Sequence, residues 1–324
     1  MAAGQASFAE AFLGPGIGRN RRLERIAELI DWSEVEALAR RVRKGETGRP
    51  PHDPAAMVKA LLLQQWYGLS DPGLEEALLD RVSFRRFCGL ALDGTTPDET
   101  TICRFRGDLV AAGLAEKVFA AVLAQLDAKG LIVREGTIID ATLVEAGVRK
   151  PPRATQEGTA TRAPAGYDPD AAFTKTGPAR KSFFGYKAHV ATDQGSGLIR
   201  RAVLTPANIY ESLVADQLIE PDVKAVYADK AYEKKERRAW LKAAGVKDRI
   251  MHRSHKNQPQ LPHWQAMRNR LITPIRAGVE RTFAVFKERY GWRRVRYRGL
   301  QRNAGHLMLI ATAFNLRRAE KLLA

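Results

Sequence analysis

Three acidic residues in separate segments are the best candidates for chemistry. Asp140 interrupts an apolar run, Asp229 follows another, and Glu280 lies in a helical segment. A carboxylate within a buried strand costs roughly several kcal/mol unless a cation or a donor meets it. If the three converge, their repulsion requires a divalent cation, and hard oxygen ligands suit Mg²⁺ or Mn²⁺. Two such ions, about 3.5–4 Å apart, could activate a hydroxyl on one side of a phosphodiester and stabilise the leaving oxygen on the other.

The segment that carries Glu280, residues 273–290, has the pattern of an amphipathic helix. Thr273 suits an N-cap and Pro274 the first helical position, so we expect the helix to begin there. At about 100° per residue, one stripe is apolar and a second, roughly 70° away, carries a carboxylate between two cations. The apolar stripe is Val279, Phe283, Phe286 and Tyr290, and the charged stripe is Arg276, Glu280 and Lys287. The alternative is that the charged stripe is only the solvated edge of an ordinary helix.

The elements expected around these acids predict an α/β domain. After Gly130 the spacing of the apolar residues changes from helical to strand-like. The expected strands are residues 136–145, 186–192, 198–205, 225–228 and 249–252. Helices are expected at 211–219, 234–244 and 303–323, besides the helix of Glu280. Residues 148–180 have no period and predict a long basic surface loop. The order predicts a mixed sheet with helices on its faces, and the strands of Asp140 and Asp229 can be neighbours.

The preceding part of the chain is predicted to be all-helical. Residues 1–20 suggest a flexible arm, and residues 21–130 a bundle of short helices joined by Pro-marked turns, with capping boxes at Ser33/Glu36 and at residues 96–99. Such a bundle is consistent with a helix-turn-helix-like domain, although any small helical bundle has this pattern. The candidates for contact with DNA are Arg85, Arg86, Arg104 and Arg106.

The charge of the chain favours a polyanionic partner. The net charge is +17, the isoelectric point is near 10.1, and residues 230–298 contain 20 Lys/Arg against 5 Asp/Glu. We expect double-stranded DNA and no membrane, because no basic amphipathic helix with an apolar aromatic face stands out. Cys88 and Cys103 form no disulfide framework, no Cys/His metal spacing occurs, and no signal segment is apparent. A cytosolic, reducing compartment is therefore expected.

With these motifs, the chain resembles the DDE transposases of bacterial insertion sequences, in particular the IS5/IS4-like group. That group's third motif is Tyr, two residues, Arg, three residues, Glu, six residues, Lys; here Thr273 replaces the Tyr. The first and second motifs correspond to Asp140-Ala-Thr142 and Asp229-Lys-Ala-Tyr232, with Ala231 where Gly is more usual. Further similar stretches are residues 61–70, 83–90 and 204–211, so the resemblance covers nearly the whole chain.

The resemblance implies an RNase H-like catalytic domain, residues 131–324, after the helical domain, which would bind DNA or dimerise. It implies cleavage at the terminal inverted repeats and transfer of the freed 3′-hydroxyl to target DNA, by a homodimer or larger assembly in the bacterial cytoplasm, associated with the nucleoid. Asp140, Asp229 and Glu280 would hold the ions. Arg276 and Lys287 would clamp phosphates, with Lys230 on the same edge.

Several other residues have two interpretations. Tyr232 could line the site or belong to the core. Trp292, among the DNA-binding candidates Arg293, Arg294 and Arg296 and close to Arg298, could stack an unpaired base, but a packed anchor is favoured. His189 is interpreted as a satisfied sheet residue and Glu145 as solvent-exposed. Asn208 could hydrogen-bond near the site or stabilise a turn.

Two rival functions remain open at this stage. A DNA-binding relative without catalysis would keep the basic residues, although the presence of all three acids argues against it. A structure-selective nuclease on the same fold would cut DNA without joining the ends to another duplex.

Overall fold

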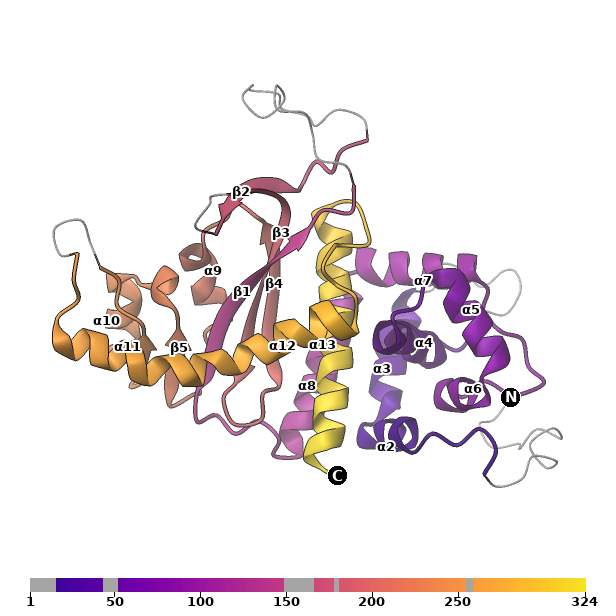
Figure 1. The fold of residues 1–324 in the computed structure, drawn as a ribbon. Coiled ribbons are helices and arrows are strands. Elements are labelled where there is room, and N and C mark those ends of the chain that lie inside the picture. Colours follow the sequence, from indigo (N-terminus) through magenta and orange to yellow (C-terminus); the bar gives the residue numbers. More distant parts are fainter. Residues whose placement is uncertain (1–15, 43–51, 149–165, 178–180, 255–258) are drawn as a thin grey trace. The chain divides into compact units, whose positions relative to one another are not determined.

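A computed structural model of the chain describes residues 16–42, 52–148, 166–177, 181–254 and 259–324. They divide into two compact units. One unit contains the described residues up to Lys129 together with Met308–Ala324, and the other is Gly130–Leu307. The first is helical, and the second is built on a mixed β-sheet (Figure 1).

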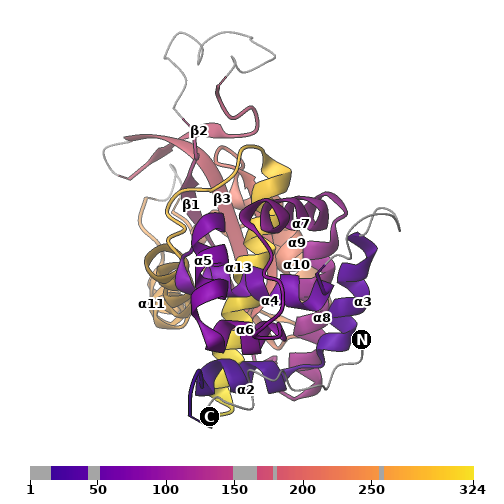
Figure 2. The same ribbon diagram turned by 90° about the vertical axis from the view of Figure 1, so that its right-hand side faces the viewer.

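The helical unit consists of short helices around one almost fully buried helix (Figure 2). That central helix, α4 (Pro54–Tyr67), begins where Asp53 accepts a hydrogen bond from Ala56 N at 2.8 Å, and it ends at Gly68, whose φ is +65°. Twelve of its 14 residues are buried. The other described helices before residue 130 are α2 (Arg21–Leu29), α3 (Trp32–Ala39), η1 (Arg40–Val42), α5 (Asp71–Asp80), α6 (Val82–Cys88), α7 (Glu99–Ala111) and α8 (Leu114–Ala128).

The two predicted capping boxes are wrong in detail. Asp31, rather than Ser33, is the N-cap of α3 and accepts a hydrogen bond from Ser33 N at 2.9 Å, while Glu36 pairs with Arg40. In α7 the cap is Asp98, which accepts from Thr101 N at 2.6 Å. In both cases an aspartate close to a Ser or Thr takes the capping position, because a short carboxylate reaches the free N–H groups directly.

The end of the chain belongs to the helical unit, although the sequence had assigned it to the catalytic domain. In α13 (Leu300–Leu322), Ala313 O accepts a hydrogen bond from Trp66 Nε1 at 2.8 Å. The carboxylate of Glu320 is buried and pairs with Arg25. These contacts hold the last 17 residues of the chain to the helices that precede residue 130.

The second unit contains a mixed six-stranded sheet. Its strands are β1 (Thr137–Glu145), β2 (Ala172–Thr176), β3 (Lys181–Asp193), β4 (Ile199–Pro206), β5 (Ala225–Ala228) and β6 (Lys247–Ile250). The order is β2-β3-β1-β5-β6, and β4 also pairs with β3. The strands β1, β2, β3 and β4 pair antiparallel, whereas β1, β5 and β6 pair parallel. The predicted mixed sheet is confirmed.

One strand lies in the segment that was predicted to be all loop. Within residues 148–180, β2 pairs with the first half of β3, and the rings of Phe173 and Phe184 lie 4.8 Å apart. The sequence of this strand has no regular spacing of apolar residues, and the strand is defined by its pairing with β3 and by this ring contact. Residues 149–165 and 178–180, which complete the predicted loop, lie outside the described residues.

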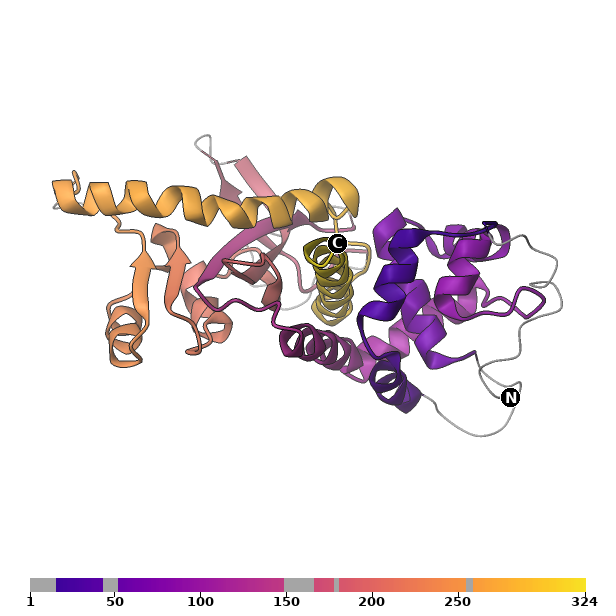
Figure 3. The same ribbon diagram turned by 90° about the horizontal axis from the view of Figure 1, so that it is seen from below.

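Helices cover both faces of the sheet (Figure 3). On one side α9 (Glu211–Leu218) and α10 (Lys235–Ala243) share a core with β1 and β5, in which Val214, Leu241 and Val226 are buried. On the other side runs α11 (His263–Arg276), which continues through η4 (Ala277–Val279), α12 (Glu280–Ala284) and the π-helical turn η5 (Val285–Arg289). The short η3 (Lys230–Tyr232) follows β5. No single helix of the described residues is long and apolar enough to span a membrane; α7 and α8 meet that test only as a pair bent by 82°.

Candidate active site

Asp140 and Asp229 lie next to each other on neighbouring parallel strands. The last paired residues of β1 and β5 are Ile139 and Ala228, so Asp140, within β1, and Asp229, directly after β5, are the next residues in this register. Asp229 Oδ1 accepts a hydrogen bond from Ala231 N at 2.6 Å and thereby caps η3. The predicted adjacency of the two strands is confirmed.

The helix of Glu280 begins eleven residues earlier than predicted, at His263 rather than Pro274. Thr273 is not its N-cap: the helix starts at His263, and Thr273 Oγ1 donates to Asn269 O at 2.8 Å within it. Pro274 also lies inside the helix, on an exposed face. The predicted apolar stripe is confirmed, since its four members are at most 8% exposed. At Gly278 the helix passes close to β1, where an added Cβ would lie 3.3 Å from Ile138 Cδ1.

Arg276 connects the first and third acids. Its Nη1 lies 2.6 Å from Asp140 Oδ2, and its Nη2 lies 3.3 Å from Glu280 Oε1. The side chains of Arg276 and Asp140 are only 20% and 17% exposed, whereas that of Glu280 is 61% exposed. Glu280 is therefore on the same side of the sheet as Asp140, brought there from a segment 140 residues away.

Burial dominates the electrostatics of this cluster. It raises the pKa of Asp140 to about 6; the Ala141 N–H and the Arg276 guanidinium oppose the rise, and the carboxylates of Asp229 and Glu280 add to it. The pKa of Tyr232 is raised well above its usual value, first by burial and then by Asp140 and other nearby acids. The Tyr232 hydroxyl has no hydrogen-bond partner among the described residues.

The donor set fits a hard divalent cation, although the side chains are not gathered around one. No cluster of three or more His, Cys, Asp or Glu within the described residues is arranged to hold a metal ion. Instead, the Arg276 guanidinium provides the positive charge between Asp140 and Glu280. Carboxylate oxygens are the ligands that Mg²⁺ and Mn²⁺ prefer, and the exposed Glu280 side chain is free to reorient.

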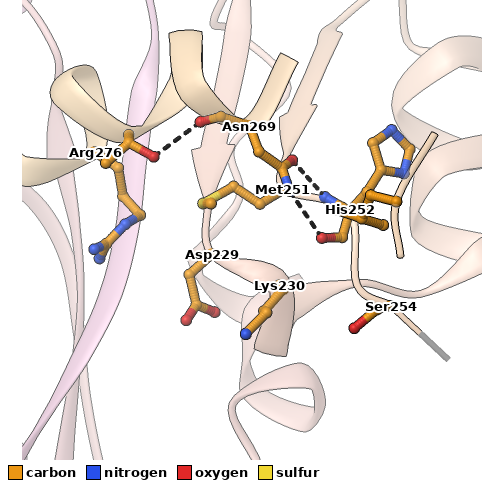
Figure 4. Close-up of a pocket in the computed structure, with 9 residues that line it drawn as sticks. Asp229, Lys230, Met251, His252, Ser254, Asn269 and Arg276 are labelled. Carbon is orange, nitrogen blue, oxygen red and sulfur yellow. Dashed lines mark hydrogen bonds between the residues drawn. The ribbon is translucent and has the colours of Figure 1, made fainter. Parts of the chain in front are cut away.

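A pocket of about 250 Å³ is lined by Asp229 and by Arg276, which pairs with the other two acids (Figure 4). The Asp229 carboxylate and Lys230 Nζ lie side by side, with the Arg276 guanidinium beyond Asp229. The Asn269 side chain stiffens the opposite wall, since it accepts from His252 N at 2.8 Å and donates to His252 O at 3.0 Å. The remaining lining residues are Met251, Ser254, Leu261 and Thr273.

His252 and Asn269 were not predicted to line a site. A signal existed for Asn269, which precedes Arg276 by seven residues, or two helical turns, and so lies on the same face. It would have been recognised had the helix been extended back to His263. For His252 the sequence holds no comparable signal.

The predicted cations near the acids lie in different environments. Lys230 lines the pocket. Burial, followed by the nearby Arg293, lowers the pKa of Lys287. Arg293 pairs with Glu288, Arg294 Nη2 lies 3.0 Å from Glu145 Oε2, and Arg296 is exposed.

Two of the four arginines predicted to contact DNA in the helical unit are instead structural. Arg85 is 5% exposed and donates to Leu78 O, Thr96 Oγ1 and the carbonyls of a nearby turn. Arg106 is also 5% exposed, and its Nη1 and Nη2 each lie 2.6 Å from an oxygen of Asp71. Guanidinium groups held in this way cannot reach a phosphate. Arg104 is exposed, and Arg86 donates to Ile17 O at 2.6 Å.

The residues with two interpretations are mostly structural. Trp292 is 1% exposed and packs edge-on to Phe286 at 6.0 Å, so it is an anchor and not a base-stacking platform. His189 Nε2 lies 3.0 Å from Thr205 Oγ1, and burial lowers the pKa of the ring to about 4. Glu145 is exposed and pairs with Arg294, as noted above. Asn208 is exposed in the turn after β4.

Comparisons with known proteins agree with this arrangement. Residues 13–108 match a family model described as "Transposase domain (DUF772)", and residues 132–316 match one described as "Transposase DDE domain". A solved cryo-EM structure of a piggyBac transposase synaptic complex with hairpin DNA has a TM-score of 0.43 and 12% identity, over 94% of this chain and 73% of that one. At that level the likeness supports no conclusion about this chain. Because the second family model covers more than half of the residues, the chain belongs to the DDE transposases, enzymes that use divalent metal ions to cleave and transfer strands of DNA.

Proposed function

We propose that this transposase belongs to the IS5/IS4-like group and acts on the terminal inverted repeats of a bacterial insertion sequence. The spacing of Arg276, Glu280 and Lys287 supports the group. The order of the sheet, an antiparallel set continued by the parallel strands β5 and β6, supports an RNase H-like catalytic domain. The observation that carries the proposal is the juxtaposition of Asp140 and Asp229 on parallel strands, with Arg276 joining Asp140 to Glu280.

Asp140, Asp229 and Glu280 would hold the metal, in our proposal two ions of Mg²⁺ or Mn²⁺. Such ions lower the pKa of a bound water or hydroxyl and stabilise charge on the leaving oxygen. The protein fixes two of the three carboxylates on the rigid edge formed by β1 and β5, and it carries the third on a helix that is docked by its apolar stripe. Sites built on such elements hold their geometry better than sites on loops.

The cations around the acids would hold the DNA backbone. The Arg276 guanidinium offers a planar fork to a phosphate, whereas Lys230 and Lys287 offer point charges. Arg293, Arg294 and Arg296 follow the helix of Glu280 and would extend this contact along the duplex, although Arg293 and Arg294 must first leave their acidic partners. These pairs are exposed, so exchanging them for phosphates costs little.

The helical unit would recognise the ends or hold two copies together. Exposed Arg104, and Arg86 after release from Ile17, are the remaining candidates for contact with DNA. We propose a homodimer or larger assembly, because two element ends must be joined to one target. The expected place of action is the bacterial cytoplasm, at the nucleoid.

Strand cleavage by single-site variants tests the catalytic assignment. The substrate is a duplex with the inverted repeats that flank the gene, incubated with Mg²⁺ or Mn²⁺. Asp140→Asn, Asp229→Asn and Glu280→Gln should each lower the cleavage rate by at least about a hundredfold, since even residues that only support metal ligands give 10- to 100-fold losses. Glu145→Gln, five residues further along β1 and exposed, is the matched control and should cleave normally.

The same reactions should yield joined products when a second duplex is supplied. Wild-type cleavage without strand transfer would contradict the proposed transposition. Normal cleavage by Glu280→Gln would remove Glu280 from the site, whatever the behaviour of the two aspartates.

A further inference from the structure

We propose that Arg276 is a gate that couples metal loading to DNA binding, an inference that rests on the proposed function of Asp140 and Glu280. In the structure its guanidinium holds Asp140, a carboxylate that the proposed metal must use. A DNA phosphate would draw the guanidinium away and thereby expose the carboxylate. The enzyme would then load its metal well only when its substrate is present.

Both oxygens of Asp140 are already engaged. Oδ1 accepts from Ala141 N at 2.8 Å, and Oδ2 accepts from Arg276 Nη1 at 2.6 Å. The first donor belongs to the backbone of β1, where Ala141 pairs with His189 of β3, so it is fixed in the sheet. The second is a side chain with several rotatable bonds. If a cation is to reach Asp140 without crowding a guanidinium, Arg276 is the group that must move.

Electrostatics oppose simultaneous binding of the two cations. Asp140 and Arg276 are mostly shielded from water, so a divalent ion beside the guanidinium would meet repulsion that solvent screens poorly. Glu280 makes the competition stronger, because Arg276 Nη2 also lies 3.3 Å from its Oε1. One side chain thus occupies two of the three proposed metal ligands.

A phosphate is a suitable competitor for this guanidinium. Arg276 lines the pocket together with Lys230, so the DNA backbone can approach it from the open side. A phosphate can accept from both Nη1 and Nη2, so one bidentate, charge-assisted contact would replace the single hydrogen bonds to Asp140 and Glu280. By linkage, a ligand that removes the guanidinium from Asp140 strengthens metal binding, and the metal strengthens DNA binding by the same factor.

Calorimetric titration of Mn²⁺ measures the coupling without any turnover. The protein is titrated alone and with a short duplex of unrelated sequence, which is not a cleavage substrate, and the titration of the duplex alone is subtracted. Wild type should bind Mn²⁺ about tenfold more tightly with the duplex, within the usual 5- to 150-fold range of such coupling. Arg276→Gln should bind it about tenfold more tightly than wild type without DNA, and should gain less than about threefold from DNA.

Two further variants separate the gate from general charge effects. Arg270→Gln removes an exposed cation of the same helix, α11, and should change the Mn²⁺ affinity of the free protein by less than about threefold. Arg276→Lys retains the charge, lacks the fork and should fall between wild type and Arg276→Gln, which provides a readout if the Gln variant folds poorly.

The outcomes are distinct. Equal gains in Arg276→Gln and Arg270→Gln, or an undiminished effect of DNA in both Arg276 variants, would overturn the gate. Asp140→Asn tests the underlying site: if it leaves Mn²⁺ binding unchanged, the proposed metal site itself is wrong. If it abolishes Mn²⁺ binding while the Arg276 variants behave like wild type, the site stands and only the gate fails.

Discussion

Replacement of Arg106 should destabilise the helical unit rather than simply weaken its contact with DNA. The guanidinium forms two hydrogen bonds of 2.6 Å with Asp71, and Gln64 Nε2 donates to the same carboxylate at 2.6 Å. The Arg106 side chain is 6% exposed and that of Asp71 is 22% exposed. This buried pair joins α7 to the first turn of α5, 35 residues earlier in the chain.

The expected magnitude follows from the charge that is left behind. Arg106→Ala leaves the Asp71 carboxylate without its cation in a mostly buried position, and breaking one partner of such a pair costs about 3–5 kcal/mol. That is a large part of a typical stability of about 5–15 kcal/mol. The melting temperature of the helical unit should fall by roughly 10–20 °C. Removal of both charges, in Asp71→Ala with Arg106→Ala, should cost less than the sum of the single changes.

Arg104→Ala is the matched control, since Arg104 is exposed and lies two residues away on the same helix. It should leave the melting temperature within about 2 °C of wild type. If Arg104 contacts a phosphate, the variant should bind DNA more weakly, and the slope of log K against log salt concentration should become shallower by about one. Circular dichroism melts and fluorescence anisotropy at several salt concentrations measure both quantities. An Arg106→Ala protein of wild-type stability with weakened DNA binding would refute the structural role of Arg106.

Three further predictions concern the sheet unit. Tyr232→Phe should raise the free energy of unfolding, measured in urea without added metal, by about 1 kcal/mol, because it removes a buried hydroxyl that has no partner among the described residues. A decrease of about 1 kcal/mol in the free energy of unfolding would contradict this prediction. Gly278→Val should slow cleavage much more than Gly278→Ala, because the larger side chain pushes the helix of Glu280 off Ile138. His189, whose pKa is depressed to about 4, should cause stability to fall as the pH drops from about 6.5 to 4, since the unfolded chain binds the proton more tightly. His189→Gln should flatten that slope in urea melts at several pH values.

The strands that bear the aspartates could be predicted because local pattern and tertiary role coincide there. The strand β5 lies where the short apolar run predicts it, with Asp229 directly after its last residue. A polar residue inside or just after such a run has few explanations other than a turn or a site. The order of the elements allowed β1 and β5 to be neighbours, and the structure pairs them in parallel.

The start of the helix of Glu280 could not be located from local signals. Thr273 and Pro274 form a good N-terminal pattern, but Pro274 is exposed, and the helix tolerates it at the loss of one backbone hydrogen bond. The ten residues before Thr273 include only one buried residue, Ile272. They therefore show little apolar periodicity, and contact with the sheet rather than propensity stabilises them.

The burial of Arg85 and Arg106 also lies beyond local prediction. A cation on a short helix between Pro-marked turns looks like a phosphate ligand, because its burial depends on partners that come together only in the folded unit. For Arg106 the partner is Asp71, and for Arg85 it is a set of carbonyl oxygens in the turn after α6. Nothing in the composition of these helices separates Arg85 and Arg106 from the exposed Arg104.

Packing and chemistry are linked in the helical run from α11 to η5. It carries a wall of the pocket at Asn269, a cation at Arg276 and an acid at Glu280, while Phe286 and its stripe dock on the core. Successive helical residues are about 100° apart, so burial of the stripe fixes the direction in which the charged shoulder projects. The free energy that buries Phe286 therefore also holds Arg276 and Glu280, an i,i+4 pair of this run, on the side of Asp140. The sequence assigned Glu280 to the proposed site through the two aspartate motifs and its spacing from Arg276 and Lys287, and the burial of the apolar stripe explains why the residue lies on the side of Asp140.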